Sequence, residues 1–144
     1  MQAACALAQM DRLEDFIAAR QRNFTFLHEQ LQCCNEWLIL PEATPGSEPS
    51  WFGFPITIRP ESGIARVELL KFLDGCKIGT RLLFAGNLTR QPYMIGRQFR
   101  IAGELANTDL VMANTFWIGV YPGLTQDMLA YTCDRIHHFC RAEK

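Results

Sequence analysis

The fold is decided at residues 51–58, which read Trp51-Phe52-Gly53-Phe54-Pro55-Ile56-Thr57-Ile58. Apolar side chains recur at every second position from Phe52 to Ile58, and this period of two predicts a β-strand with one face on the core. Proline has no N–H to donate to a neighbouring strand. Pro55 therefore predicts that this strand lies at a sheet edge or carries a bulge there.

Short apolar runs on both sides of this stretch predict three more strands. Residues 37–40 stop at a proline, residues 80–84 run into a polar loop, and residues 116–121 end at Pro122-Gly123. Proline and glycine interrupt regular structure, so these boundaries separate strands from the segments that join them. Residues 41–50, which are rich in proline, glycine and serine, are expected to form a loop.

Helical periodicity occupies most of the remaining sequence. Residues 2–32 contain no glycine or proline, and their apolar residues recur three, four or seven positions apart, which predicts one amphipathic helix about 45 Å long. Residues 64–73 predict a second helix that ends at Asp74-Gly75. A short helix is expected after Asn107 or Thr108, with Asp109 in its first turn, and Thr125 is the expected N-cap of a last helix.

The sequence also predicts which faces of two of these helices are buried. The predicted stripe of the second helix is Ile64, Val67, Leu70 and Leu73. The predicted stripe of the last helix is Met128, Leu129, Thr132, Ile136 and Phe139-Cys140. The order helix, strand, strand, helix, strand, helix, strand, helix predicts one α+β domain over residues 1–144, with a long N-terminal helix and a short, mostly antiparallel sheet covered by helices.

Composition excludes several classes of protein. The 144 residues are 49% hydrophobic and 20% charged, with a formal net charge of −1. The apolar fraction excludes a disordered chain, and the lack of a basic excess argues against a nucleic-acid partner. No apolar stretch approaches the ~20 residues that cross a bilayer, and residues 1–8 lack the basic start of a secretory signal. We therefore expect a soluble, cytoplasmic protein that binds no membrane.

Six cysteines raise the question of a metal site. Cys133, His137 and Cys140 are four and three positions apart, so they could share one face of a helix. A soft metal ion would suit this trio, but a closed zinc site takes four ligands and no fourth lies nearby in the sequence. Free cysteines are among the most often buried residues, so we favour buried structural thiols and expect no metal ligands.

The richest polar segment runs from residue 81 to residue 93. It carries Arg81, Asn87, Thr89, Arg90 and Gln91, interrupted by aromatic residues. Arginine binds phosphate oxygens with two parallel hydrogen bonds, and an aromatic face can cover a base or a sugar. A solvated loop that only connects two elements is the alternative interpretation of the same composition.

The chain shows no convincing catalytic group of its own. His28 falls in the long helix, and the adjacent His137 and His138 point in different directions. A lysine that forms a Schiff base needs a desolvated pocket to lower its pKa. We expect none of the lysines to be buried in this way; they are Lys71, Lys77 and Lys144.

Longer motifs resemble a known family. Residues 1–4 (MQAA), 7–10 (LAQM) and 20–23 (RQRN) look like the helix that opens the C-terminal part of DegT/DnrJ/StrS-type sugar aminotransferases. Three further motifs are similar to one branch, the CDP-4-keto-6-deoxyglucose 3-dehydrases of dideoxysugar and O-antigen biosynthesis. These are residues 50–55 (SWFGFP), 78–92 (IGTRLLFAGNLTRQP) and 114–125 (NTFWIGVYPGLT).

The resemblance implies a homodimer of pyridoxal-phosphate-dependent fold type I, of which this chain covers the small C-terminal domain. The dehydrase branch uses pyridoxamine phosphate and a histidine in place of the usual lysine, and it holds an iron–sulfur cluster through cysteines. All of these groups would precede Met1, so neither the six cysteines nor His137 and His138 match them. We expect this chain alone to bind no cofactor and to have no catalytic residues.

The resemblance also implies which residues of this chain contact the substrate. Many aminotransferase relatives have an H-x-Q-P motif where this chain reads Thr89-Arg90-Gln91-Pro92, and the difference fits the dehydrase branch. We expect Phe84, Asn87, Thr89 and Arg90 to line the mouth of the active site and to touch a CDP-sugar. Arg81 is a second choice for such a contact.

Two functions remain open at this point. In the first, the chain is part of a nucleotide-sugar C3-dehydrase and contributes substrate contacts and dimer surface. In the second, it is a non-catalytic remnant, or a nucleotide-sugar-binding module that pairs with a full-length paralogue. Both interpretations expect apolar surface that a large domain would cover, and therefore self-association.

Overall fold

A computed structural model describes residues 1–142 and contains a four-stranded antiparallel sheet. The strands lie in the order β1-β2-β4-β3. They are β1 (Leu38–Ile39), β2 (Gly53–Ile58), β3 (Thr80–Leu82) and β4 (Thr115–Gly119). The central pair places Phe54 opposite Ile118 and Ile56 opposite Phe116. Side chains alternate across a strand, so these four residues share the face that is buried.

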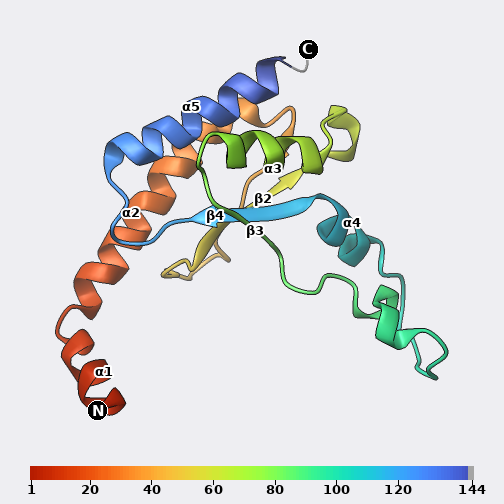
Figure 1. The fold of residues 1–144 in the computed structure, drawn as a ribbon, viewed down its shortest axis with the longest axis horizontal. Helices are drawn as coiled ribbons and strands as arrows, with labels where there is room; N and C mark the ends of the chain where they lie inside the picture. Colours follow the sequence, from red (N-terminus) through yellow and green to blue (C-terminus); the bar gives the residue numbers. More distant parts are fainter. Residues whose placement is uncertain (143–144) are drawn as a thin grey trace.

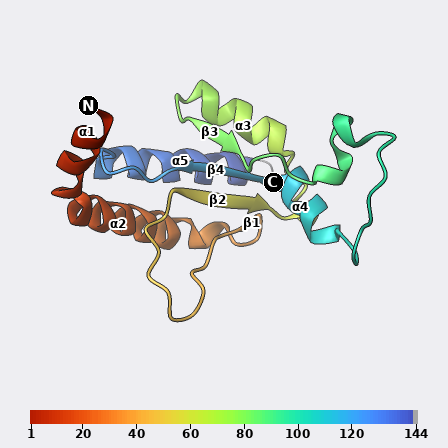
Figure 2. The same cartoon turned by 90° about the horizontal axis from the view of Figure 1, so that it is seen from below.

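Helices cover one face of this sheet, as Figures 1 and 2 show. The helices are α1 (Gln2–Met10), α2 (Leu13–Leu31), α3 (Arg66–Gly75), α4 (Ala106–Asn114) and α5 (Gln126–Ala142). Helix α5 packs against both α2 and α3, whereas α1 extends away from the body and α4 lies at one end of the sheet. The predicted α+β class, with helices against a small antiparallel sheet, is confirmed.

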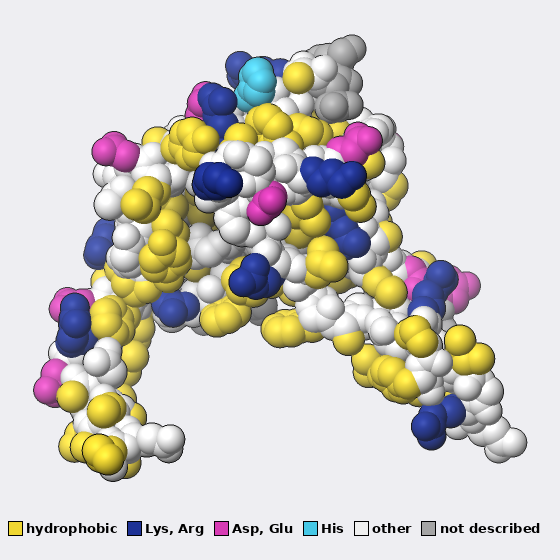
Figure 3. Space-filling view, in the orientation of Figure 1, with side chains coloured by type: hydrophobic (Ala, Val, Ile, Leu, Met, Phe, Trp, Pro, Cys, Tyr) yellow, Lys and Arg dark blue, Asp and Glu magenta, His cyan; other side chains and the backbone are white. Residues whose placement is uncertain are grey.

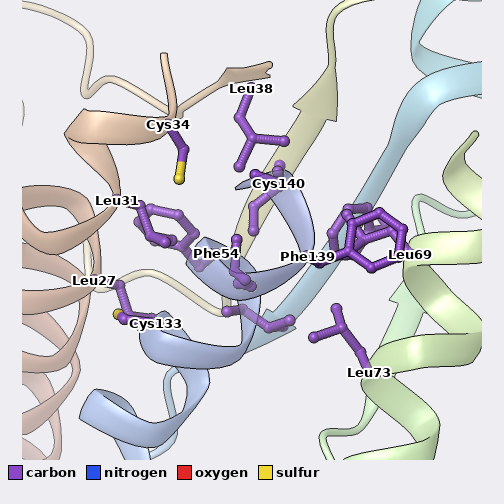
Figure 4. Close-up of a cluster of buried hydrophobic side chains, with 14 of the residues drawn as sticks. Leu27, Leu31, Cys34, Leu38, Phe54, Leu69, Leu73, Cys133, Phe139 and Cys140 are labelled. Carbon is purple, nitrogen blue, oxygen red and sulfur yellow. The ribbon is translucent and has the colours of Figure 1, made fainter. Parts of the chain in front are cut away.

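The core lies between the sheet and helices α2, α3 and α5 (Figure 4). Side chains from all of these elements meet there with almost no exposed surface. They include Leu27, Leu31, Leu38, Phe54, Leu69, Leu73 and Ile136. Full burial of each such side chain contributes roughly 1.5–3 kcal/mol relative to leaving it exposed. The opposite face of the sheet, which carries Pro55 and Trp117, is free of helices in the part of the chain described.

The prediction of one unbroken helix over residues 2–32 is wrong. The backbone turns at Asp11 and Arg12, where the Arg12 N–H donates to the Gln9 carbonyl, and α2 starts afresh at Leu13. Glu14 and Asp15 lie in the first turn of α2, where the helix dipole favours negative charge. Apolar periodicity continues across the break, so it could not show where one helix ends.

Pro55 lies in a central strand, whereas the sequence predicts an edge strand or a bulge. Strand β2 is central, with β1 on one side and β4 on the other. Strand β1 pairs only with Thr57 and Ile58, however, so β4 is the one neighbour at Pro55. The prediction of an edge strand is wrong for β2 as a whole, but it holds locally, because at Pro55 β2 is the edge of the sheet and has only β4 beside it.

Two of the predicted helix faces also need correction. In α3 the buried residues are Leu69 and Leu73, whereas Val67 is 57% exposed. In α5 the buried set is Leu129, Cys133, Ile136, Phe139 and Cys140. The prediction is confirmed for Leu129, Ile136, Phe139 and Cys140, but Met128 is exposed, Thr132 is only half-buried, and Cys133 is buried in its place. The predicted N-cap is confirmed, since Thr125 Oγ1 accepts from the Met128 N–H at 3.3 Å.

Phe52 shows where the strand pattern ends. The alternation at residues 51–58 is confirmed for Phe54, Ile56 and Ile58, which are buried. Phe52 precedes the first residue of β2, is exposed, and packs its ring on Trp117 with centroids 5.0 Å apart.

Among residues 1–142, no helix is both long and apolar enough to cross a membrane.

Candidate functional site

The segment between β3 and α4 contains most of the residues predicted to bind substrate. It leaves the end of the sheet and projects from the body of the molecule (Figure 1). Two short 3₁₀ turns, Leu88–Arg90 and Pro92–Met94, are its only regular structure. Two residues near its start have left-handed backbone angles, Phe84 with φ 46° and Gly86 with φ 65°. For phenylalanine this conformation is strained, at a cost of about 1–2 kcal/mol.

Gly86 fixes the start of this loop against α4. A Cβ atom at Gly86 would lie 2.5 Å from Met112 Cγ, so only glycine allows the loop backbone to pack this closely against the Met112 side chain. The next residue continues the contact, since the Asn87 N–H donates to Met112 Sδ at 3.3 Å. The loop is therefore anchored at its root, although the rest of it extends outward.

Asn87 is the buried centre of a hydrogen-bond network. Only 3% of its surface is exposed. Its Nδ2 donates to Asp109 Oδ1 at 2.6 Å, and its Oδ1 accepts from the Thr89 N–H at 3.0 Å and from Thr89 Oγ1 at 2.7 Å. The Asn87 amide thus caps the first 3₁₀ turn and ties it to the first turn of α4.

Asp109 joins this network to a cationic group that faces solvent. Its Oδ2 pairs with the Arg90 guanidinium, while its other oxygen accepts from Asn87. The Arg90 side chain is 64% exposed, so one end of the guanidinium is fixed and the other donors remain available. The ion pair itself contributes little stability at this exposure, but it orients the arginine. The sequence placed Asp109 in the first turn of α4 but gave no sign of this pairing.

Phe84 and Arg81 lie apart from the network. Phe84 is 85% exposed. Arg81 is an exposed residue of β3 and lies opposite Trp117 of the neighbouring strand β4. One Arg81 Nη donates to the neighbouring Thr80 carbonyl at 2.9 Å. The structure thus brings Asn87, Thr89 and Arg90 together through Asp109, and it places Arg81 on the helix-free face of the sheet.

A pocket of about 310 Å³ lies beside Phe84, at the start of the loop between β3 and α4. Phe84, Gly86, Gln91 and Met112 line it, together with Arg66 from the first turn of α3. One Arg66 Nη donates to the carbonyls of Met112 and Thr115, at 2.7 and 3.1 Å, while its Nε is buried without a hydrogen-bond partner. The sequence gave no reason to select Arg66, because its role depends on contacts more than forty residues away.

A larger pocket lies elsewhere. It has a volume of about 540 Å³ and is lined mainly by apolar groups of α5 and the end of β4, among them Tyr121, Leu124 and Met128. None of the predicted site residues contributes to it. Its lining offers few charged groups, with Lys77 as the cation, so it lacks the donors that a sugar phosphate needs.

The cysteines behave in part as predicted. Cys34, Cys133 and Cys140 are buried as predicted, whereas Cys5 and Cys33 are exposed, so the prediction of buried thiols is wrong for those two. Burial raises the pKa of Cys133 to about 12. His137 does not join these two thiols in the arrangement that the sequence suggested. Its Nε2 lies 3.2 Å from the sulfur of Cys33, at the end of α2.

Comparison with known proteins assigns this geometry to a family. Residues 1–137 match the DegT/DnrJ/EryC1/StrS aminotransferase family. The lipopolysaccharide biosynthesis protein RfbH of Salmonella typhimurium is 59% identical over 96% of this chain and 32% of its own length. The dTDP-4-dehydro-2,6-dideoxy-D-glucose 3-dehydratase of Saccharopolyspora spinosa is 48% identical over 96% of this chain and 30% of its length. The chain thus spans about a third of these relatives.

Solved structures agree on the fold. The E. coli GDP-4-keto-6-deoxy-D-mannose-3-dehydratase with bound hydrated PLP matches 90% of this chain and 33% of its own, with a TM-score of 0.79 at 23% identity. An aminotransferase from Psychrobacter cryohalolentis matches 99% of this chain and 38% of its own, with a TM-score of 0.85 at 14% identity. The observed helices and sheet are therefore those of about a third of a PLP-dependent aminotransferase fold.

Proposed function

The chain belongs to the DegT/DnrJ/EryC1/StrS aminotransferase family, and from this premise we propose that it forms the substrate-side wall of a nucleotide-sugar 3-dehydrase. Residues 1–144 would constitute the small domain of that enzyme. Two relatives, at 48% and 28% identity, are named as sugar 3-dehydratases, and the RfbH relative is named for lipopolysaccharide biosynthesis. Removal of the C3 hydroxyl of a 4-keto sugar is the reaction that these names favour.

The observation that carries the proposal is the anchored cation at Arg90. Asp109 fixes one side of the guanidinium, and Asn87 in turn fixes Asp109. A guanidinium oriented in this way can bind a phosphate oxygen without losing much side-chain freedom. Phe84, which lies apart from this network in the same loop, is an exposed ring that could cover a base or a sugar.

The predicted site residues then divide by role. Phe84 and Arg90 would touch the nucleotide sugar, with Arg81 as a further contact from the helix-free sheet face. Asn87 and Thr89 would lie at the mouth of the site. Because their side-chain groups bond to Asp109 and to each other, we expect their main effect to be the orientation of Arg90. The substrate would be a CDP-sugar, the nucleotide that the branch resemblance implies.

Pyridoxal or pyridoxamine phosphate does not fit the described residues by themselves. A Schiff-base lysine needs a desolvated pocket, and Lys71 and Lys77 are both exposed. We infer that the cofactor, and the iron–sulfur cluster implied by the resemblance, would be held by parts of the family fold that lie outside these residues. We expect the chain alone to bind neither, and to pair with that larger part as a homodimeric enzyme in the cytoplasm that serves O-antigen synthesis.

Titration of the ¹⁵N-labelled chain with nucleotides tests the substrate side of this proposal by NMR. CDP should shift amide resonances between Phe84 and Arg90, and it should do so at lower concentration than GDP or dTDP. Arg90→Ala should weaken CDP binding by about tenfold or more, the loss expected for one charge-assisted hydrogen bond.

Arg100→Ala is the matched control, since it removes an exposed arginine from the same loop. This variant should bind CDP as the parent does. Shifts confined to the 540 Å³ pocket around Tyr121, or no shifts with any nucleotide, would contradict the proposal.

A further inference from the structure

Three metal-binding side chains converge where α2 ends against α5. Cys33 and Cys34 lie in the 3₁₀ turn Gln32–Cys34 that follows α2, and His137 projects from α5. Their ligand atoms, two sulfurs and a ring nitrogen, all lie within 4.8 Å of one another. The pair Cys33 Sγ and His137 Nε2 is separated by 3.2 Å. Residues more than 100 positions apart in the sequence thus form one cluster.

We propose that Cys33, Cys34 and His137 bind a soft divalent metal ion of the Zn²⁺ class. Zinc takes thiolate sulfur at about 2.3 Å and imidazole nitrogen at about 2.0–2.1 Å in a tetrahedral arrangement. In that geometry two sulfurs lie about 3.8 Å apart, and sulfur and nitrogen lie about 3.6 Å apart. The Cys33 Sγ–His137 Nε2 distance of 3.2 Å is about 0.4 Å shorter than the latter value, and the other separations exceed theirs by at most about 1.2 Å, within reach of side-chain rotation.

A fourth sulfur stands next to the cluster. The Cys34 thiol hydrogen-bonds to Cys140 on α5, and this bond, together with burial, raises the pKa of Cys34. Cys140 has no exposed surface, whereas Cys33 is exposed and His137 half-buried. The site therefore has sulfur ligands on its buried side and is open to solvent on the other side, so an ion can enter past Cys33. Sulfur and imidazole ligands favour zinc over magnesium or calcium, which prefer oxygen.

The metal-free cluster is held by weaker bonds that an ion would replace. The Gln30 carbonyl oxygen lies 2.9 Å from His137 Nε2 and 3.6 Å from Cys33 Sγ. Binding requires that Nε2 release this carbonyl and that each ligating thiol lose its proton. Burial raises the pKa of Cys33, and the hydrogen bond with Cys140 and burial raise that of Cys34; the positive charge of Arg141, one turn beyond His137, offsets these shifts only in part, so the ion itself must displace the thiol protons. A bound ion would link the C-terminal end of α2 to α5 directly.

Cobalt(II) is the spectroscopic probe for this site, because it binds the ligands of zinc and reports them by absorption. Titration of the 144-residue chain in oxygen-free buffer should produce visible bands of tetrahedral cobalt and a near-ultraviolet thiolate-to-cobalt band. Both should saturate at one equivalent and vanish when Zn²⁺ is added. Cys33→Ser and His137→Gln should each weaken cobalt binding by more than about tenfold.

Two controls separate this site from adventitious binding. Cys5→Ser removes an exposed thiol on α1, and His138→Gln removes the neighbouring imidazole, whose ring packs on Phe72 instead. Both variants should bind cobalt as the parent does. Circular dichroism melts check that each variant is folded. As a second readout on the unaltered chain, Zn²⁺ should slow alkylation of Cys33 by more than about tenfold relative to Cys5.

Several results would overturn the proposal. One is the absence of a thiolate-to-cobalt band at saturating cobalt. Another is unchanged binding in folded Cys33→Ser, and a third is an equal loss in Cys5→Ser. Equal alkylation of Cys33 with and without Zn²⁺ would likewise show that the cluster is only a hydrogen-bonded contact between two helices. None of these measurements depends on the proposed dehydrase function.

Discussion

At the scale of single residues, the loop that carries the proposed substrate contacts depends on Gly86. Gly86 and Gly96 both have left-handed backbone angles, but only at Gly86 would a Cβ meet another side chain, Met112. We expect Gly96→Ala to lower the free energy of unfolding by about 1 kcal/mol, the backbone cost alone. Gly86→Ala should cost about 1–3 kcal/mol more because Met112 must move. Urea denaturation of the two variants compares them; equal losses would refute the contact.

Cys133 gives a residue-scale prediction for pH. Burial raises its pKa from 9.0 to about 12 in the folded chain. The unfolded chain therefore loses this proton first, and stability falls as pH rises from about 9 toward 12. For the metal-free chain we expect a loss of up to about 1.4 kcal/mol per pH unit from this thiol.

The matched comparison for Cys133 is Cys133→Ala, measured by denaturant unfolding at pH 8 and at pH 10.5. The variant is less stable at pH 8, since it leaves a small cavity. Its stability should nevertheless fall less steeply with pH than that of the parent. Parallel pH profiles for the two proteins would mean that the folded state does not hold this thiol neutral.

Residue-level features could be predicted from the sequence when they depend on near neighbours. The N-cap at Thr125 is an example, because its partner Met128 is three positions away. Asp109 is the opposite case. Its carboxylate organises Asn87 and Arg90, which lie 22 and 19 positions earlier, and no local pattern indicates such a pairing.

At the scale of elements, α1 buries none of its residues against the rest of the described chain, residues 1–142. None of its nine residues is buried, whereas α2 buries Ala19, Asn23, Leu27 and Leu31. A short isolated helix is marginal in water. Hydrogen exchange should therefore be fast throughout α1 and slow in the second half of α2. Protection of α1 equal to that of α2 would show that another surface covers it, for instance that of a second copy.

The elements themselves could largely be predicted from periodicity, but their orientation could not. The strands and helices follow the expected order, yet α3 buries Leu69 instead of Val67. In α5 the buried face is turned toward Cys133. Apolar residues occur on both sides of these helices, so the choice of face is made by the neighbours that they pack against. The same holds for Pro55, whose tolerance depends on how short β1 is.

At the scale of the whole molecule, exposed apolar side chains gather on two projections, α1 and the loop between β3 and α4 (Figure 3). On the loop they include Phe84, Tyr93, Ile95, Phe99 and Ile101. Large exposed apolar patches favour association. We expect light scattering to give a mean mass above that of a monomer, rising with concentration.

Serine substitution at Ile95 and Phe99 tests which surface is responsible for this association. The double variant should shift the chain toward monomer because it removes two of the exposed apolar groups on the loop. Substitution of Lys71, an exposed residue of α3, by alanine should leave the mass unchanged. A parent chain that stays monomeric at every concentration would contradict the expectation.

The central claim is that these residues supply the substrate wall of a nucleotide-sugar 3-dehydrase. The most direct measurement replaces the matching 30% of the Saccharopolyspora spinosa 3-dehydratase with this chain and assays dehydration of dTDP- and CDP-linked 4-keto sugars. We predict an active chimaera that gains turnover of the CDP-sugar, and that loses it about tenfold or more on Arg90→Ala but not on Arg100→Ala. A folded, cofactor-loaded chimaera that dehydrates neither sugar would contradict the account.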